Sequence, residues 1–232
     1  MLQKISVPMV LRALEKLYDP PKTFLHWRTP LDLLVATTLS AQCTDVRVNI
    51  VTKTLYKKYQ KPEDYLRVSR QELEQDIHSC GTYHMKAKHI QELCGLLIEH
   101  HKGQVPDSME ELITLPGVGR KTASIILHVV FDKAEGIAVD THVLRVAQRL
   151  GLTKHATPQQ IELDLMARTP KKHWNRINTL LISHGRAVCT ARNRRCQMCV
   201  FQKRCPSSVT RGKPDLARKS GEPLPRKRTL LG

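Results

Sequence analysis

Residues 112–123 of this chain have the sequence LITLPGVGRKTA, in which an apolar run leads through Pro116 into two glycines and an Arg-Lys-Thr triplet. Residues 124–131 continue with mostly apolar side chains, so the stretch predicts a helix, a glycine turn and a second helix. Because glycine has no Cβ atom, Gly117 and Gly119 can adopt left-handed backbone angles and approach another surface closely. The turn is therefore expected either to offer N–H groups to an anion such as phosphate or simply to join two packed helices.

The chain is strongly basic. Its 232 residues include 38 Lys and Arg against 21 Asp and Glu, a formal net charge of +17. A protein of this charge usually binds a polyanion. Nucleic acid is the first candidate partner, and an acidic membrane surface is the second. The most apolar window, residues 123–131, is too short to span a membrane, and charged residues interrupt the first 17 residues, where a secretory signal would lie. We expect a cytoplasmic, nucleoid-associated protein with no membrane partner.

The start of one helix is clearly marked. Thr29 has the residue type of an N-cap, Pro30 suits the first helical position, and Asp32 follows three residues after the cap. Residues 31–39 are nearly all apolar, which predicts a helix that is buried on all sides.

Two later helix starts are also marked. Asp140 precedes a helical pattern over residues 141–150, and its carboxylate is expected to accept an N–H of the first turn. The sequence TPQQ at residues 157–160 has the spacing of a capping box. Residues 136–139 are apolar but short and isolated, and we interpret them as a connector. About ten helices and no sheet are expected, so the chain is predicted to be an all-α protein.

The seven cysteines are odd in number, which together with a reducing compartment argues against a disulfide framework. Three of them, Cys43, Cys80 and Cys94, are scattered in helical segments and are interpreted as core residues. The other four lie within seventeen residues at the spacing C-x6-C-x2-C-x5-C, and they are Cys189, Cys196, Cys199 and Cys205. Four thiolates ligate either an iron–sulfur cluster or a structural zinc ion. A single C-x2-C pair favours the cluster.

Basic residues concentrate at this end of the chain. From residue 186 onward, 13 Lys and Arg stand against only Asp215 and Glu222. This imbalance predicts a surface that lies against phosphates and whose affinity falls as salt rises. Residues 207–232 are rich in Pro, Gly, Ser, Lys and Arg, and we predict a disordered basic tail. The basic residues among and beside the four cysteines are Arg192, Arg194, Arg195, Lys203 and Arg204.

Three motifs together resemble those of the endonuclease III family of helix-hairpin-helix DNA glycosylases. They are the hairpin at residues 115–123, the sequence VDTH at residues 139–142, and the four-cysteine loop, and they occur in the family's order. The resemblance covers residues 29–206. It implies a bifunctional enzyme that removes a damaged base from DNA and then cleaves the strand at the abasic site.

The resemblance also implies a fold of two helical lobes. Residues 22–132 would form a six-helix domain that carries the hairpin, and residues 1–21 would join residues 133–206 in a domain that holds a 4Fe-4S cluster. Duplex DNA with oxidised pyrimidines or abasic sites would lie across the cleft between the lobes, with the damaged nucleotide flipped out of the duplex. The protein would act as a monomer.

Within this family pattern, Lys121 and Asp140 match the catalytic residues. The positive end of the helix and desolvation would favour the neutral amine that Lys121 needs as a nucleophile. The amine would attack the sugar C1′ and expel the base, and β-elimination from the resulting Schiff base would break the strand. Asp140 would stabilise the positive charge that develops on the sugar, in addition to capping its helix.

The resemblance further implies a set of DNA contacts. Gln42 matches the residue that fills the space left by the flipped base, and Thr82 stands where the family often places a leucine wedge. Because threonine is smaller and partly polar, its presence is expected to alter the preference for the opposite base. His142 and His184 either contact phosphate or bond to buried polar groups. A bulky residue at Gly119 is expected to weaken binding and chemistry together. The predicted DNA contacts are Gln42, Thr82, Gly117, Val118, Gly119, Arg120, His142, Arg192, Arg194 and Arg195.

Two alternatives remain open. A monofunctional adenine-mismatch glycosylase shares the fold, the cysteine loop and the aspartate, but it typically lacks a lysine at the place of Lys121 and carries a further C-terminal domain. A non-catalytic DNA-binding protein would use the hairpin only to bind phosphate, and the presence of both Lys121 and Asp140 argues against it.

Overall fold

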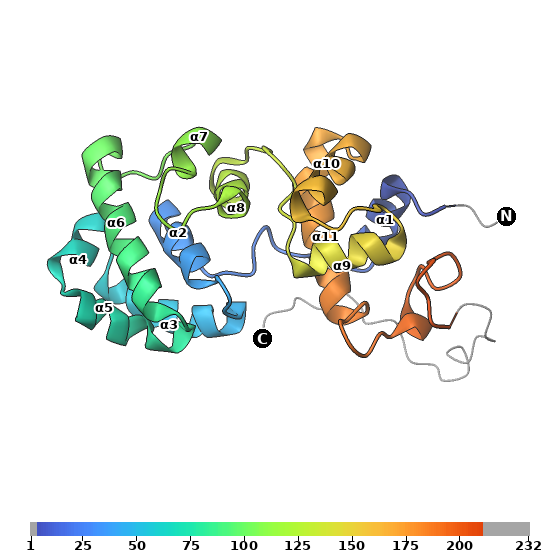
Figure 1. Cartoon of the computed structure of the whole chain (residues 1–232), viewed down its shortest axis with the longest axis horizontal. Helices are drawn as coiled ribbons and strands as arrows, with labels where there is room; N and C mark the ends of the chain where they lie inside the picture. Colours follow the sequence, from blue (N-terminus) through green and yellow to red (C-terminus); the bar gives the residue numbers. More distant parts are fainter. Residues whose placement is uncertain (1–3, 211–232) are drawn as a thin grey trace. The chain divides into compact units, whose positions relative to one another are not determined.

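The structure is a computed structural model that describes residues 4–210 (Figure 1). Within this range, eleven α-helices and three short 3-10 helices are joined by loops, and no β-strand occurs. The predicted all-α class is therefore confirmed. The predicted basic tail begins at residue 207, and its part from residue 211 onward lies outside the described residues. No described helix is both long enough and apolar enough to cross a membrane.

The helices form two compact units. One unit is Thr23–Glu135, and the other joins the residues up to Lys22 to those from Gly136 onward. The resemblance described above implies lobe boundaries after residues 21 and 132. Each unit has its own hydrophobic core.

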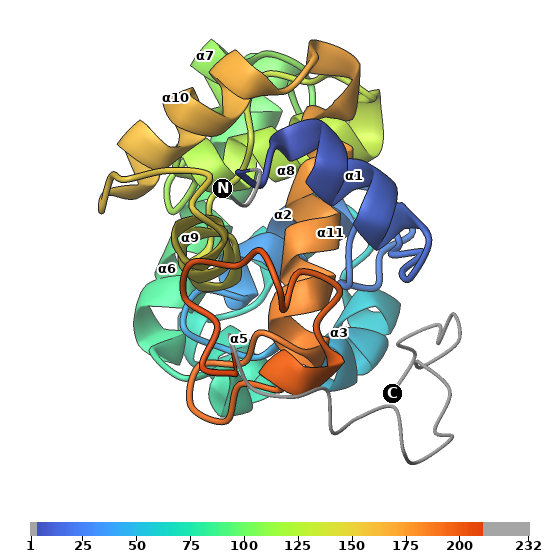
Figure 2. The ribbon, with the colours of Figure 1, turned by 90° about the vertical axis from the view of Figure 1, so that its right-hand side faces the viewer.

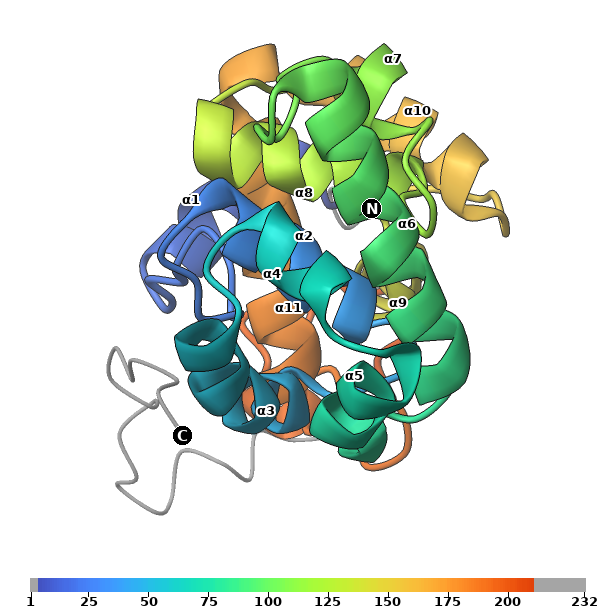
Figure 3. The same cartoon turned by 90° about the vertical axis from the view of Figure 1, so that its left-hand side faces the viewer.

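The Thr23–Glu135 unit is built around helix α2 (Pro30–Leu39), which packs against α3, α6 and α8 (Figure 3). Every residue of α2 except Pro30 is buried, as its apolar sequence predicted. Thr29 and Asp32 form the predicted capping box: the Thr29 hydroxyl accepts the Asp32 N–H at 3.1 Å, and the Asp32 carboxylate accepts the Thr29 N–H at 3.3 Å. The surrounding helices are α3 (Asp45–Lys58), α4 (Pro62–Arg67), α5 (Arg70–Ile77), the 3-10 helix η1 (His78–Cys80), α6 (Tyr83–His101), the four-residue α7 (Met109–Leu112) and α8 (Arg120–Phe131).

The three scattered cysteines belong to this unit. Cys80 and Cys94 are buried in its core, and the half-buried Cys43 packs against the same core. Their interpretation as core residues is therefore confirmed.

The second unit is built around α11 (Trp174–Ala187), which packs against α1 (Val7–Glu15) and α9 (Thr141–Leu150) (Figure 2). Helix α10 (Pro158–Arg168) contacts α9. The first helix of the chain thus completes a core formed mainly by residues from 136 onward. The 3-10 helices of this unit are η2 (Lys171–His173) and η3 (Cys196–Met198).

One predicted cap in this unit differs from its expected form. The Thr157 hydroxyl donates to Gln160 Oε1 at 2.9 Å, and the Thr157 side chain accepts no backbone N–H of α10. The two side chains satisfy each other, so the capping box predicted at residues 157–160 is not formed.

Candidate functional site

The glycine turn between α7 and α8 has the pattern of a type II β-turn. The Val118 N–H donates to the Leu115 carbonyl at 3.0 Å, and Pro116 and Gly117 occupy the two central positions. Gly117 has φ +77°, an angle that glycine adopts readily and other residues rarely do. A Cβ atom on Gly117 would lie 2.9 Å from Nδ1 of His89 on α6. The backbone angle and the neighbouring ring both require glycine here.

Gly119 has a different function in the turn. Its backbone is extended, with φ −88° and ψ 172°, so of the two glycines only Gly117 uses the left-handed angles that both residues allow. It is the N-cap of α8 and has no side chain that could accept a first-turn N–H. No atom lies within 4 Å of the place a Cβ would take. What glycine provides at this position is open access to the beginning of α8.

Lys121 is the second residue of α8, and its side chain is exposed, as is that of Arg120. Val118 instead points into the core, with 5% of its surface exposed, and its N–H is used inside the turn. Ala123 and Leu127 are fully buried on α8 and fix the helix against the core of its unit. The hairpin therefore presents Arg120 and Lys121 from a helix that packing holds in place.

Asp140 belongs to the other unit and caps α9 as predicted, since its Oδ1 accepts the Val143 N–H at 2.8 Å. Asn178 of α11 donates to the Ala138 carbonyl and so holds the connector that leads into this cap. His142, in the first turn of α9, has Nδ1 3.0 Å from Nη2 of Arg145. The carboxylate of Asp140 thus lies at a helix start whose preceding connector is bonded to Asn178 and whose first turns are bonded through His142 and Arg145.

Gln42 and Thr82 lie in exposed loops of the Thr23–Glu135 unit. Both have a positive φ, +54° for Gln42 and +39° for Thr82. Such an angle is rare in residues other than glycine and costs most for a β-branched residue such as threonine. Two of the predicted DNA contacts therefore stand on strained backbone, which is often found at functional sites.

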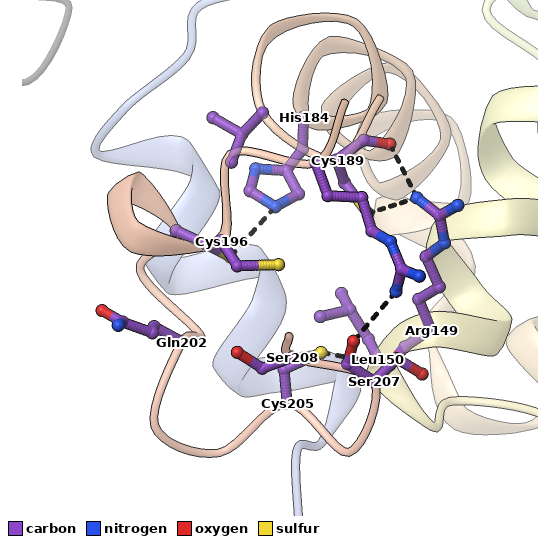
Figure 4. A pocket seen from close by; sticks show the side chains of 12 residues that line it. Arg149, Leu150, His184, Cys189, Cys196, Gln202, Cys205, Ser207 and Ser208 are labelled. Atoms are coloured by element: carbon purple, nitrogen blue, oxygen red, sulfur yellow. Dashed lines mark hydrogen bonds between the residues drawn. The ribbon is translucent and has the colours of Figure 1, made fainter. Parts of the chain in front are cut away.

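The four cysteines of the C-terminal loop line one pocket, together with His184 of α11 and Arg149 of α9. Figure 4 shows Cys189, Cys196 and Cys205 around a common space, with Arg149 extending toward it from α9. Sequence spacing predicted that these thiols would come together, and all four cysteines border this pocket.

His184 supports the cysteine loop from inside. Only 1% of its surface is exposed, its Nδ1 lies 3.2 Å from the Tyr18 hydroxyl, and its Nε2 lies 3.5 Å from Cys199 Sγ. Burial lowers the pKa of His184 to about 4. Of the two functions considered for this residue, the bond to buried polar groups is the correct one.

Arg149 is a residue that sequence reasoning missed. Its guanidinium donates to the carbonyls of Thr190 at 2.7 Å and Ala191 at 3.1 Å, and its Nη1 lies 3.5 Å from Cys189 Sγ. These partners follow Arg149 by about forty residues, and no local pattern indicates the contact. Arg149 ties the beginning of the cysteine loop to α9.

The basic residues of this loop differ in their surroundings. Arg192 and Arg195 are exposed, whereas Arg194 is half-buried and donates to the Ser207 carbonyl at 3.0 Å. Arg194 therefore stabilises the loop itself, and Arg192 and Arg195 present their charge outward.

The donor set of the pocket fits an iron–sulfur cluster. Thiolates are the ligands of such clusters, and all four predicted cysteines border the same space. Among the described residues, no three His, Cys, Asp or Glu side chains are close enough to hold a single metal ion.

Comparison with known proteins identifies the family. Residues 35–171 match the HhH-GPD superfamily of base excision DNA repair proteins. The chain is also 48% identical over 199 residues to endonuclease III of Synechocystis sp.. This alignment covers 86% of this chain and 91% of that protein. The chain belongs to the HhH-GPD superfamily. A second relative, endonuclease III of Bacillus subtilis, is 42% identical over 220 residues, covering 94% of this chain and all of that protein.

A solved structure of endonuclease III is also similar to this chain. A trapped endonuclease III–DNA covalent intermediate, an estranged-adenine complex, superposes with a TM-score of 0.85 and 43% sequence identity. The match covers 90% of this chain and 98% of the other. The superfamily match includes Lys121 and Asp140, and the cysteine loop follows it in the sequence.

Proposed function

We propose that this HhH-GPD protein excises oxidised pyrimidines from duplex DNA and cleaves the strand at the resulting abasic site. The observation that carries the proposal is Lys121, an exposed amine at the second position of α8, directly after the glycine turn. A chain so similar to two endonuclease III proteins is expected to use such a lysine as a nucleophile. The protein would act as a monomer on the DNA of the nucleoid.

The proposed reaction proceeds in two steps. The neutral amine of Lys121 attacks C1′ of the flipped nucleotide, the N-glycosidic bond breaks, and the base leaves with its bonding electron pair and takes up a proton. Ring opening gives a Schiff base between the lysine nitrogen and C1′. Loss of the C2′ proton then expels the 3′ phosphate by β-elimination and breaks the strand.

Two further groups support this chemistry in the proposal. The carboxylate of Asp140 stabilises the positive charge that develops on the sugar. The N–H groups at the beginning of α8, beside the open space at Gly119, bind a DNA phosphate and thereby position the nucleotide relative to Lys121. Arg120, Arg192 and Arg195 are exposed basic residues that would contact the phosphates around the site.

We also propose that the four cysteines hold a 4Fe-4S cluster. When bound, the cluster supplies four iron–thiolate bonds that close the loop over residues 189–205, and no redox change is needed. The chain's own residues already prepare this loop, since Arg149 bonds to its beginning and His184 contacts Cys199. Protein purified without oxygen should show broad visible absorbance and contain iron. Cys199→Ser should lose both, whereas Cys43→Ser, which lies outside the pocket, should keep them.

Borohydride trapping tests the catalytic proposal. The native protein is mixed with duplexes that contain an oxidised pyrimidine or an abasic site, and the Schiff base is reduced to a stable adduct. Lys121→Ala should give no adduct, while Lys88→Ala, at an exposed lysine on α6, should react as the native protein does.

The two alternatives predict different outcomes in the same experiment. A monofunctional adenine-mismatch glycosylase would release adenine from a mismatched duplex without forming an adduct. A non-catalytic hairpin protein would bind the duplex and release no base. An absent adduct with the native protein on both substrates would rule out the bifunctional enzyme.

A further inference from the structure

Lys86 is a buried lysine on α6 that the proposed reaction does not use. Only 4% of its surface is exposed, and its Nζ donates to the carbonyls of Leu39 at 2.8 Å and Cys80 at 2.6 Å. A buried ammonium loses its hydration, so it is retained only where other groups replace the water. Leu39 is the last residue of α2, and the partial negative charge of a helix C-terminus favours a cation there.

The two carbonyls that Lys86 binds stand at the entrances of two loops. After Leu39 the chain enters residues 40–44, which contain Gln42. After Cys80 it enters the turn at residues 81–82, where Gly81 has φ +62° and Thr82 has φ +39°. One ammonium group therefore links the loops that carry the two predicted DNA contacts.

A second contact joins the same loops. Burial and the neighbouring Cys43 thiol raise the pKa of the Cys80 thiol to about 11, so the two side chains lie near each other beside Lys86. The loop over residues 40–44 and the turn at residues 81–82 therefore lie side by side in the Thr23–Glu135 unit.

Lys86 also holds the strained turn on both sides. Its Nζ binds the Cys80 carbonyl before the turn, and its backbone N–H donates to the Thr82 carbonyl at 3.2 Å after it. A β-branched residue at a positive φ is unfavourable and persists only when its surroundings determine its conformation. The ammonium bond to the Cys80 carbonyl provides such a constraint before the turn, and the backbone bond that follows the turn is the ordinary first bond of α6.

We propose that Lys86 is a positioning residue that holds the loop over residues 40–44 and the turn at residues 81–82 in a fixed relative position. Gln42 and Thr82 then enter the duplex at the same site, and the protein distinguishes an abasic site from intact DNA. Because the loops are ordered before they bind, little conformational entropy is lost on binding. The inference rests on the proposed function, in which these loops penetrate the duplex.

The test compares Lys86→Met with Lys88→Met in the full-length protein that retains its native absorbance. Methionine keeps an unbranched apolar side chain but removes the charge and the donors. Lys88 is on the same helix and is exposed, and its Nζ lies 3.7 Å from Oε1 of Glu92. It is therefore a matched control. The DNA probes are an undamaged duplex and one with a tetrahydrofuran abasic analogue, with 2-aminopurine placed opposite that analogue.

We expect Lys86→Met to bind the tetrahydrofuran duplex about tenfold more weakly than the native protein, while its affinity for undamaged duplex stays within about twofold. At saturating protein, the 2-aminopurine fluorescence should rise less than with the native protein, because the opposite base is displaced from the stack less often. A merely structural function would reduce the fraction of active protein but not the signal per saturated complex. Lys88→Met should match the native protein in all three measurements.

The inference is overturned if Lys86→Met matches Lys88→Met in affinity and in saturated fluorescence. It is also overturned if Lys86→Met loses affinity for both duplexes equally. If Lys86→Met does not fold, Lys86→Gln, which keeps a donor without the charge, is measured in its place against the same criteria. Failure of the proposed function is distinguished by the native protein, which would then form no borohydride-trapped adduct.

Discussion

Gly117 of the hairpin lies directly against the imidazole ring of His89, so that a Cβ atom on Gly117 would be 2.9 Å from Nδ1 and 3.2 Å from Cγ. This contact seats the turn on α6, the helix that also carries Lys86. The hairpin that starts α8 and the residue that links the loops at Gln42 and Thr82 therefore share one structural support.

Gly117→Ala should destabilise the protein, whereas Gly119→Ala should not. Alanine at position 117 would have to adopt φ +77° and displace His89, at a cost of about 1–3 kcal/mol in the free energy of unfolding. Alanine at position 119 meets open space on extended backbone, and its effect should stay within about 0.5 kcal/mol. Urea denaturation of both variants measures the difference. Equal stability of the two variants would contradict this account of the turn.

Gly119→Asn should separate stability from DNA binding. Asparagine is a favourable N-cap, so its side chain can bond to the first-turn N–H groups of α8 and keep the fold at least as stable as before. The same side chain would occupy the groups proposed to bind phosphate, and affinity for duplex DNA should fall about tenfold. Fluorescence anisotropy with a labelled duplex measures the affinity. An unchanged affinity would show that phosphate does not bind at this helix start.

Asp140→Asn and Asp140→Ala should distinguish capping from catalysis. Asparagine can still accept the Val143 N–H through its Oδ1, so Asp140→Asn should keep its stability and lose base-excision rate because the negative charge is gone. Asp140→Ala should lose the rate and also about 1 kcal/mol of stability. Single-turnover kinetics and thermal unfolding give the two quantities separately. Full activity of Asp140→Asn would eliminate the electrostatic function.

Arg149→Met should loosen the cysteine loop. The substitution removes the bonds from the guanidinium to the Thr190 and Ala191 carbonyls, with an expected loss of about 1–3 kcal/mol in the free energy of unfolding. Iron should also be released faster to a chelator, followed as loss of visible absorbance. Arg12→Met, at an exposed arginine on α1 of the same unit, is the control. Identical iron release from both variants would contradict the supporting function of Arg149.

Local sequence was sufficient where short-range chemistry decides the structure. The cap of α2 is formed by Thr29 and Asp32, three residues apart, and the cap of α9 by Asp140 and Val143 at the same spacing. The burial of α2 followed from its uninterrupted apolar sequence, since such a helix is stable only inside a core.

Sequence reasoning was insufficient where the partners are distant in the chain. Lys86 binds a carbonyl 47 residues earlier, and Arg149 binds carbonyls about forty residues later. Neither residue belongs to a local motif. A long basic side chain on a helix is usually exposed, so only the packing of the folded chain shows that such a side chain bonds to distant carbonyls. The sequence pattern also predicted the same backbone freedom for both hairpin glycines. In the structure, only Gly117 has a neighbouring ring and a positive φ.

The amino-acid sequence by itself determined the all-α class, the glycine turn before Lys121, the cap at Asp140 and the gathering of four cysteines, because each depends on residues close together in the chain. Tertiary structure alone decided which glycine is indispensable, which cations are buried, and that the loops bearing Gln42 and Thr82 lie side by side. The physical reason is that a buried charge or a steric limit depends on the groups that folding brings around it, and those groups come from distant parts of the chain.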